Sequence, residues 1–573
     1  MYALYNRKVT KQQVTPNTPA RWPEGAIVYH IYPRSFQDAN GDGIGDLPGI
    51  SQRLPYLKTL GVNAIWMSPF YPSPMADFGY DIADYCDVDP RFGTLDDFKQ
   101  LLETAHKHDI KVMVDLVPNH SSDEHPWFKT SRSSKDNDKA NWYIWRDGKA
   151  HEYDDAGKPL PPNNWRDVLT GGSAWQWDDS RQQFYLHSFD VKQPDLNWQN
   201  PDVREAFKDV MRFWLDLGVD GFRVDAVYWM AKEPLYLDDP INSDYIEGHD
   251  ALYYELLHTN SQGWPPVFAY LSEMCDVLKD ARYKDKPRFM VTEAYPERHN
   301  PIETYLEFYV GMDPQVAAPF NFEGIGLPWE AAAWRVFLNR FHAALNQLSP
   351  LCVSSYAFGN HDQWRLATRL GKDRARSAAI LLLTLPGMSF VYYGEELGME
   401  NVPIPPEYVH DPAARGGENT GRDPERTPMQ WDASAHAGFT SGPTTWLPIA
   451  ANYAECNVEN ESNDPTSSLS LYRKLGLLRN EKQSLRTGGI KVFEHTPSDV
   501  LVFMRSHPDD DSYLTVINFS DKPVSCTLPV PAAKVVVSSN PMALADLPDK
   551  SIDSYNLQPH EAILCLVVGI SQK

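Results

Sequence analysis

The chain has 573 residues, and its 53 Lys and Arg against 77 Asp and Glu leave a formal net charge of −24. Domains commonly hold roughly 100 to 250 residues, so this length predicts two or three units, one of them large enough to be a barrel. The acidic surplus repels phosphate backbones and anionic lipid headgroups, which excludes nucleic acid and membrane surfaces as expected partners.

Short apolar runs alternate with helical patterns along most of the chain, which is typical of a parallel sheet. Helices are expected at residues 50–60 and 94–108, the second with Thr94 as its N-cap. Strands are expected at residues 26–33, 62–69, 111–118, 221–227, 288–293, 316–322, 353–358 and 388–393. Eight such strands predict an α/β fold, a (β/α)8 TIM barrel, in which the active site lies at the C-terminal ends of the strands.

The third and fourth expected strands are separated by roughly 100 residues, far more than a usual connection. This stretch is rich in Trp, Asn, Asp and Gly, which predicts an inserted subdomain over the barrel mouth. After a helix near residues 467–480, short alternating runs predict a C-terminal antiparallel β domain. The expected division is barrel at 1–120 and 193–486, inserted subdomain at 121–192 and C-terminal domain at 487–573.

The run GFRVDAV, residues 221–227, places two charged residues on an expected buried strand. Arg223 and Asp225 alternate with apolar residues, so a strand directs both side chains to one face. A neighbouring guanidinium lowers the pKa of a carboxyl, and an ionised carboxylate can act as a nucleophile. The run by itself fits a structural salt bridge equally well.

Acidic and histidine residues recur at the ends of other expected strands: Asp115, His120, Glu293, His361 and Asp362. Taken singly, such residues are usually solvated loop residues or structural histidines. In a barrel, however, the strand ends meet at one cleft. Two carboxyls that flank a glycosidic bond are the groups that glycoside hydrolysis needs, one as nucleophile and one as general acid.

The loop DANGDGIGD follows the first strand and resembles the first part of a calcium loop. Its expected oxygen ligands are Asp38, Asn40, Asp42, Ile44 (by its carbonyl) and Asp46. The glutamate that closes an EF-hand at position 12 is absent. We expect a structural Ca²⁺ here, the alternative being a loop of Asx turns with no metal.

The six cysteines lie far apart without a CxxC pair, which predicts free thiols. The N-terminus has no apolar segment typical of a signal peptide, and no apolar run of membrane-spanning length follows. We therefore expect a soluble, cytoplasmic protein. Nothing in the sequence indicates its oligomeric state.

From about residue 22 onward, the chain resembles glycoside hydrolase family 13, the α-amylase superfamily, in its α-glucosidase and oligo-1,6-glucosidase branch. The resemblance rests on the strand-end blocks and on three further segments, residues 73–85, 192–204 and 421–432. It implies that Asp225 is the nucleophile, Glu293 the acid/base and Asp362 a third acid that holds sugar hydroxyls. Arg223 is then expected to keep Asp225 ionised, and a drier setting to keep a proton on Glu293.

The resemblance also implies a closed pocket for one terminal glucose, which makes the enzyme exo-acting. Tyr80 is expected to stack on the sugar ring, and Asp77 and Arg422 to pair across it. The pocket residues that it implies are Asp77, Tyr80, His120, Arg223, His361 and Arg422. The implied substrates are small α-glucosides such as maltose and short malto-oligosaccharides.

Two positions bear on specificity. Relatives are expected to carry phenylalanine before the GGSAW run, whereas Leu169 and Thr170 stand there, so an apolar wall of the glucose site is expected to be missing or supplied from elsewhere. The residue after the nucleophile is Ala226, and the resemblance links a small residue there to α-1,4 preference and valine to α-1,6.

Rival functions share the fold. Sucrose isomerases and trehalose synthases use the same chemistry but keep the glucosyl unit from water, and the arginine-rich isomerase signature is absent from residues 318–329. Transporter heavy chains carry the fold as a non-catalytic ectodomain, with a membrane span and incomplete acids. The complete acid set here favours an α-glucosidase with possible transglucosylation.

Overall fold

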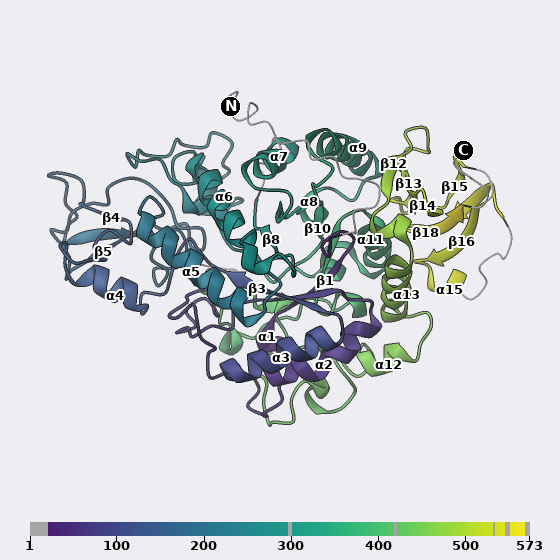
Figure 1. Ribbon diagram of the computed structural model, residues 1–573, viewed down its shortest axis with the longest axis horizontal. Coiled ribbons are helices and arrows are strands. Elements are labelled where there is room, and N and C mark those ends of the chain that lie inside the picture. Colours follow the sequence, from purple (N-terminus) through teal and green to yellow (C-terminus); the bar gives the residue numbers. More distant parts are fainter. Residues whose placement is uncertain (1–20, 296–300, 417–420, 531–532, 545–550, 568–573) are drawn as a thin grey trace.

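The structure is a computed structural model that describes residues 21–295, 301–416, 421–530, 533–544 and 551–567 (Figure 1). Within these residues lies an eight-stranded parallel sheet in the order β10-β11-β1-β2-β3-β7-β8-β9. Its strands are β1 Ile27–Ile31, β2 Ala64–Met67, β3 Lys111–Leu116, β7 Gly221–Val224, β8 Phe289–Thr292, β9 Ala317–Pro319, β10 Ser355–Ala357 and β11 Met388–Tyr392.

The sheet curves into a nearly closed barrel. Beyond the last strand, β9, Asn321 pairs in parallel with Tyr356 of β10, and its amide donates to the Ser355 carbonyl at 2.7 Å. Apart from Lys111, the strand residues are buried, because helices cover the outside and side chains fill the inside. The prediction of a (β/α)8 barrel from eight apolar runs is confirmed.

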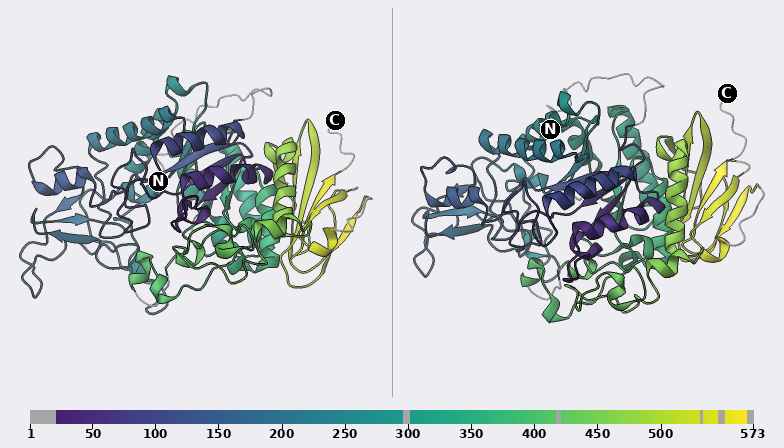
Figure 2. Two further views of the ribbon diagram at one scale, coloured as in Figure 1. Left: turned by 90° about the horizontal axis from the view of Figure 1, so that it is seen from below. Right: turned by 60° about the horizontal axis from the view of Figure 1, so that its bottom comes forward.

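Helices surround the barrel, as the two further views show (Figure 2). They include α1 Pro33–Phe36, α2 Leu47–Thr59, α3 Leu95–Lys107, α5 Pro201–Leu217, α6 Pro266–Leu278, α7 Pro301–Gly311, α8 Glu323–Gly326, α9 Ala331–Leu348, α10 Leu366–Leu370, α11 Lys372–Thr384, α12 Val458–Ser462, α13 Ser468–Glu481 and α14 Gln483–Arg486. Thr94 caps α3 in a reciprocal box with Asp97, as its sequence predicted. Helix α5 ends at Gly218, whose φ of 116° favours glycine.

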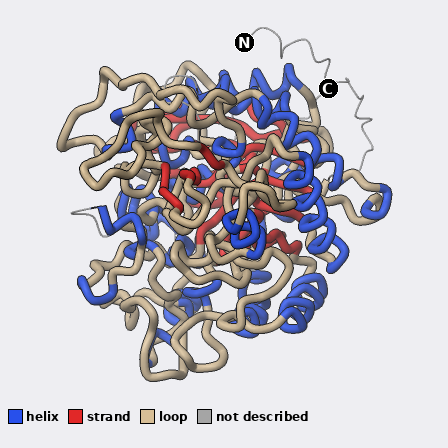
Figure 3. The backbone as a smooth tube through the Cα atoms, turned by 90° about the vertical axis from the view of Figure 1, so that its left-hand side faces the viewer, coloured by secondary structure: helices blue, strands red, loops and turns tan. Residues whose placement is uncertain are grey.

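The long connection between β3 and β7 holds α4 Pro126–Ser133 and a three-stranded antiparallel sheet, at the left of Figure 1. Its strands are β4 Trp145–Arg146, β5 Trp175–Asp178 and β6 Gln183–Leu186. Trp165, Trp175 and Phe184 form a small hydrophobic core of their own. Seen from that side, this part of the molecule is built largely of loops (Figure 3).

The chain ends in antiparallel sheets at the right of Figure 1, with strand order β12-β13-β14-β18-β16 and a separate pair β15-β17. The elements are β12 Gly489–Val492, β13 Val500–His507, β14 Asp510–Asn518, β15 Val524–Thr527, β16 Ala533–Ser538, α15 Pro541–Leu544, β17 Ser554–Leu557 and β18 Ala562–Val567. Arg505 of β13 donates to the Thr384 carbonyl of α11 at 2.6 Å, which ties this domain to the barrel.

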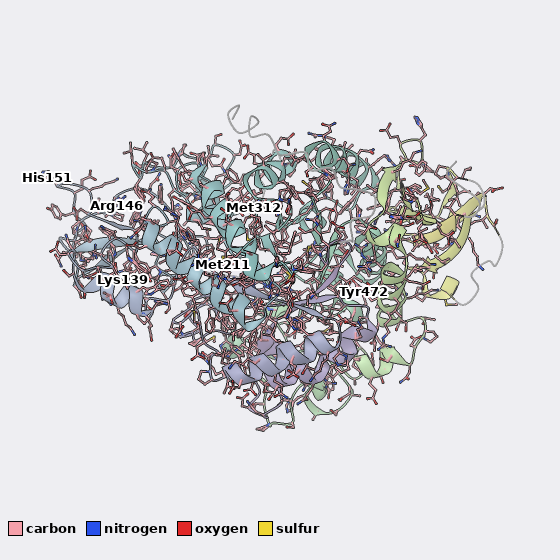
Figure 4. All side chains as sticks on the ribbon, viewed as in Figure 1. Lys139, Arg146, His151, Met211, Met312 and Tyr472 are labelled. Carbon is pink, nitrogen blue, oxygen red and sulfur yellow. The ribbon has the colours of Figure 1, made fainter. Side chains whose placement is uncertain are left out.

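Side chains fill the interior between these elements (Figure 4). Cys86, Cys275, Cys352, Cys456, Cys526 and Cys565 are all free thiols, as their spacing predicted. No helix among the described residues has both the length and the apolar character needed to cross a bilayer.

Candidate active site

The predicted polar strand ends meet at the C-terminal edge of the barrel. Asp115 lies in β3, Arg223 lies in the neighbouring β7, and Asp225 follows directly after it. Glu293 follows β8, which pairs with β7 on its other side. Because parallel strands end at the same edge, these four side chains come together although 178 residues of sequence separate the first from the last.

Arg223 is the centre of this group. Its Nη1 lies 2.9 Å from Asp115 Oδ1 and 2.5 Å from Asp225 Oδ1, and its Nη2 lies 2.7 Å from Glu293 Oε1. The rigid fork of one guanidinium therefore holds Asp225 and Glu293 close to each other. Retaining glycosidases place their two carboxyls about 5–5.5 Å apart, and such a shared cation suits that short separation better than the wider inverting geometry.

Glu293 has further donors. The backbone N–H of Ala226 donates to its Oε2 at 3.0 Å, and the Tyr295 hydroxyl donates to its Oε1 at 3.1 Å. Ala226 can present its N–H in this way because β7 has ended and its own φ is 47°, the left-handed conformation that starts the turn η2 Val227–Met230. The sequence did not predict either contact, because both depend on where the chain turns.

One cation serves three buried acids here. Burial raises the pKa of Asp225 well above its ordinary value, and the opposing effect of Arg223 does not offset it. Burial likewise raises the pKa of Asp115 to about 6 against the effect of Arg223. The direction for Asp225 differs from the one expected from Arg223 alone, because burial outweighs Arg223 and the neighbouring acids Glu293 and Asp115 add to the upward shift. The cluster is thus built to hold a proton near neutral pH.

A second cluster surrounds Arg422. Its Nη2 lies 2.6 Å from Asp77 Oδ1 and 2.7 Å from Asp411 Oδ1, and its Nη1 lies 3.0 Å from Asp362 Oδ1. The predicted pairing of Asp77 with Arg422 is present. Asp411 was not predicted as a site residue, since nothing in its local sequence marks it.

Arg426 adds a second cation to this cluster. Its Nη2 lies 3.0 Å from Asp362 Oδ1, and its Nε donates to the His361 carbonyl at 2.8 Å. Burial pushes the pKa of Asp362 upward, but the arginines outweigh burial and lower it. Arg422 lowers the pKa of Asp411 in the same way. These carboxyls are therefore ionised and held as acceptors.

The remaining predicted pocket residues link the two clusters. Tyr80 donates to Asp115 Oδ2 at 3.0 Å, and its ring stacks on His361 with centroids 5.2 Å apart. Gln193, which the sequence analysis missed, lies with its Nε2 3.1 Å from Asp77 Oδ2 and 3.1 Å from His120 Nε2. Burial lowers the pKa of His120 to about 4, so its ring is neutral at pH 7.

Thr170 occupies a turn. Its hydroxyl donates to Asp167 Oδ2 at 2.6 Å and accepts from the Gly172 amide at 3.1 Å, which satisfies the side chain locally. An aromatic ring nevertheless borders the site, because Phe189 packs with its centroid 5.1 Å from that of His120. A half-buried ring from another segment thus lies beside a pocket residue.

The loop at residues 38–46 is closed by its own hydrogen bonds. Asp38 Oδ1 accepts from the Asn40 and Gly41 amides at 2.9 and 2.7 Å, and Asp46 accepts from the Gly49 amide at 2.6 Å as the N-cap of α2. Across the described parts of the chain, no group of three or more His, Cys, Asp or Glu side chains could hold a metal ion. The oxygen donors suit Ca²⁺ by type, and the calcium site stays a prediction.

The barrel has two close carboxyls at its mouth, a cluster of aspartates held by two arginines beside them, and an aromatic ring at the edge. This is the arrangement of a glycoside hydrolase. Comparison with known proteins identifies which kind. The family description "Alpha amylase, catalytic domain" matches residues 30–488, and the chain belongs to this family of glycoside hydrolases.

The chain is similar in sequence to named relatives over most of their length. The chain is 37% identical over 513 residues to "Alpha-glucosidase" from Apis mellifera, covering 88% of this chain and 86% of the relative. It is 38% identical over 510 residues to "Maltase A2" from Drosophila melanogaster, covering 87% of each.

The fold is also similar to those of solved structures. An "alpha-glucosyl transfer enzyme" has a TM-score of 0.84 at 37% identity, covering 96% of this chain and 100% of that one. The trehalulose synthase from Pseudomonas mesoacidophila has a TM-score of 0.82 at 34% identity with the same coverage.

Proposed function

We propose that the protein is a retaining, exo-acting α-glucosidase that removes terminal glucose, preferably α-1,4-linked, from short oligosaccharides such as maltose. The observation that carries the proposal is the Arg422 cluster. Arg422 forms ion pairs with Asp77, Asp362 and Asp411. These side chains close one end of the site beside Asp225 and Glu293. A closed end accommodates one terminal sugar ring and not the middle of a chain.

In this proposal Asp225 attacks the anomeric carbon while Glu293 protonates the leaving oxygen. Water then resolves the glycosyl-enzyme with Glu293 as base, so two inversions retain the α configuration. Glu293 accepts hydrogen bonds from the Ala226 amide and the Tyr295 hydroxyl and contacts Arg223, which fixes its position beside Asp225. The mechanism requires the transferable proton on Glu293 once a sugar is bound, and a leaving oxygen that accepts a hydrogen bond favours that arrangement.

Asp362, Asp77 and His120 are proposed to bind the hydroxyls of the terminal ring, and Tyr80 to lie under it. The low pKa of Asp362 supports this role, because an ionised carboxylate accepts hydroxyl hydrogen bonds and meets the positive charge that develops on the ring. His120 is neutral at pH 7, so it adds no positive charge to the part of the pocket that it lines. We also propose that Asp38, Asn40, Asp42, Ile44 and Asp46 hold a structural Ca²⁺.

Glucosyl transfer to a sugar acceptor is a second candidate activity. A cleft of about 380 Å³ opens beside Asp362 and Arg422. Its other lining residues are Gln363, Trp364, Arg369, Ala413, Gly421 and Glu425. Trp364, which is 56% exposed, lines this cleft together with Asp362 and offers a stacking surface for an acceptor ring. Two structurally similar proteins are named an alpha-glucosyl transfer enzyme and a trehalulose synthase.

The test is product analysis with purified protein on maltose, isomaltose, maltotriose and sucrose, read by chromatography over time. We expect glucose as the first product from maltose, released as the α anomer. Isomerised disaccharide without free glucose from sucrose would identify an isomerase instead. Internal cleavage of a long malto-oligosaccharide before terminal glucose appears would refute the exo-acting site.

A further inference from the structure

The Arg422 cluster joins two loops that are far apart in the sequence. Arg422 Nη2 lies 2.6 Å from Asp77 Oδ1 and 2.7 Å from Asp411 Oδ1. Asp77 lies between β2 and α3, and Asp411 lies between the turns η6 Pro406–Tyr408 and η7 Pro412–Gly416. Because a guanidinium is a rigid fork, both loops have to be placed accurately before one nitrogen can contact both carboxylates.

The loop that carries Asp77 has a strained backbone. Met75 and Phe78 lie on either side of Asp77, and their φ angles are 65° and 46°. This left-handed conformation is uncommon for bulky side chains and persists only where the surrounding structure determines it. Contacts from outside the loop are therefore needed to hold Asp77 in place.

Trp446 contacts the sequence neighbours of both aspartates. Phe78 directly follows Asp77, and its ring centroid lies 5.4 Å from that of Trp446. His410 directly precedes Asp411, and its ring stacks on Trp446 with centroids 6.2 Å apart. The Phe78 and His410 centroids lie 6.0 Å apart. The three rings thus form one aromatic group between the two loops, at distances typical of favourable ring contacts.

Trp446 is itself fixed to the first part of the barrel. Its indole Nε1 donates to Ser35 Oγ of α1 at 3.0 Å (Figure 1), and its backbone amide donates to the Gly43 carbonyl at 3.2 Å. The Arg34 guanidinium lies over the Trp446 ring at 4.9 Å and over the Phe78 ring at 5.3 Å, two cation–π contacts that join these rings. Hydrogen bonds as well as stacking therefore hold the half-buried indole.

A row of stacked rings also leads from Trp446 to the ring proposed to lie under the sugar. Tyr32 stacks on Trp446 with centroids 6.3 Å apart and on His361 with centroids 5.8 Å apart. His361 in turn stacks on Tyr80. Removal of the indole is therefore expected to loosen both the charged and the aromatic parts of the pocket.

We propose that Trp446 is a positioning residue for the terminal-glucose pocket. It acts through Phe78 and His410, which fix the two aspartates that Arg422 binds. This inference rests on the proposed function, in which the Arg422 cluster binds the terminal ring. The alternative is that the indole only covers the apolar core, against which it also packs. The two roles differ in substrate affinity, because a ring that only covers the core affects stability alone.

Steady-state kinetics on maltose tests the inference. In Trp446→Leu we expect KM for maltose and the inhibition constant of glucose to rise at least about 10-fold, with kcat lowered by less than about 3-fold, because the lost interactions bind ground state and transition state alike. The Arg223 cluster keeps its own contacts, so the chemical step is retained. Trp446→Phe keeps a ring between the loops and should recover most of the affinity.

Trp22→Leu is the matched control. Trp22 is also half-buried, its indole donates to the Pro287 carbonyl at 3.1 Å, and its ring centroid lies 6.1 Å from that of Phe289. Phe289 begins β8, so this contact lies at the end of the barrel opposite the site, and KM should be unchanged. A wild-type KM in Trp446→Leu, or an equal rise in the control, overturns the inference, while glucose release by the wild type still supports the proposed function.

Melting temperatures test the same inference without a substrate. Asp411→Asn removes the ion pair that the ring is proposed to position, so Trp446→Leu should lower the melting temperature less in that background than in the wild-type protein. Trp22→Leu should lower it equally in both. Equal losses for Trp446→Leu overturn the inference. A wild type that releases no glucose from maltose refutes the proposed function, and this comparison then still decides whether Trp446 holds Asp411.

His410→Ala replaces Trp446→Leu if the latter does not fold. His410 is exposed, so its loss disturbs the interior little, and circular dichroism establishes folding in each variant. This variant should raise KM for maltose by about 3-fold, because one of the two ring contacts is lost. An unchanged KM in the folded His410→Ala protein then overturns the inference.

Discussion

The two arginine clusters at the barrel mouth contain the same kinds of groups in different proportions. Among the described residues, Arg223 is the only cation in ion-pair contact with Asp115, Asp225 and Glu293, whereas Arg422 is joined at one of its three aspartates, Asp362, by Arg426. In the first cluster burial raises the pKa of two acids, and in the second the arginines lower the pKa of two. The second cluster is not uniform, because burial raises the pKa of Asp77 against the effect of Arg422. The comparison indicates that an added cation such as Arg426 favours an ionised acceptor, whereas burial with one shared cation favours a protonated acid.

The largest effect is expected in the Arg223 cluster. Asp225→Asn and Glu293→Gln should each lower kcat on maltose by at least about 10⁴-fold with the fold retained, because one loses the nucleophile and the other the transferable proton. Initial rates and circular dichroism measure this. Near-normal turnover in either variant would refute the assigned roles.

Azide rescue distinguishes those two roles. Azide should restore turnover to Asp225→Gly with an inverted glucosyl azide, because it replaces the nucleophile in one displacement. With Glu293→Gly it should give the retained azide, because it resolves the glycosyl-enzyme without needing a base. Products are identified by NMR, and the same anomer from both variants would contradict the division of roles.

Disrupting the Arg422 cluster should lower activity less than removing Asp225 or Glu293. Arg422→Ala leaves buried carboxylates without their cation, which costs about 3–5 kcal/mol of stability. If the same energy is lost from transition-state binding, kcat/KM falls by about 10²- to 10⁴-fold. Arg422→Lys should recover only part of it, since a point charge cannot contact three carboxylates in a fork. Rates on maltose measure both, and full activity in the alanine variant would show that this end of the site does not bind substrate.

Linkage preference is expected to depend on the side chain that follows the nucleophile. We expect maltose to be cleaved better than isomaltose, and Ala226→Val to shift the ratio toward isomaltose by about 10- to 200-fold, the range for one or two methyl-sized groups in a pocket. The comparison is kcat/KM on both disaccharides for both proteins. A wild type that prefers isomaltose refutes the linkage assignment, and an unchanged ratio in the variant refutes its cause.

The loop at residues 38–46 offers a third set of acids, with backbone amides as donors. If it binds Ca²⁺, excess chelator should lower the melting temperature by a few degrees and leave turnover below that temperature nearly unchanged, because the ion binds only the folded state. Asp42→Ala should abolish the calcium-dependent shift. An unchanged melting curve after prolonged dialysis against chelator would contradict the proposed calcium site.

The smallest effect expected is the pH dependence of stability, which has opposite signs in the two clusters. The raised pKa of Asp115 favours the folded protein below its unfolded value and loses this contribution as pH rises through about 6. The lowered pKa of Asp411 contributes above the unfolded value and is lost as pH falls through the folded one.

These signs predict the behaviour of two variants. Asp115→Asn should gain in melting temperature relative to wild type as pH rises from about 4 to 7, whereas Asp411→Asn should lose as pH rises toward about 4, each by roughly 1–3 °C. Differential scanning calorimetry from about pH 2.5 to 7 measures both trends. Parallel trends in the two variants would show that the clusters do not differ in proton binding.

The amino-acid sequence by itself determined the barrel and the chemistry of its mouth. Short apolar runs must become strands buried on both faces, and Asp225, Glu293 and Asp362 stand at the ends of such runs, where a parallel barrel gathers them. Local patterns of this kind act over a few residues, which is why they can be recognised without a structure. The Thr94 cap was predictable for the same reason.

Only the tertiary structure decided how charge is distributed between these residues. Arg223 lies two positions from Asp225 and therefore suggested a single ion pair. Folding buries Asp225 and adds Asp115 and Glu293 to the same guanidinium, and burial first, then these acids, reverses the direction of its pKa shift. Asp411, Gln193 and Phe189 joined the site through contacts across many residues of sequence. Electrostatic energy depends on distance in space and on burial, and neither quantity is a property of a short stretch of sequence.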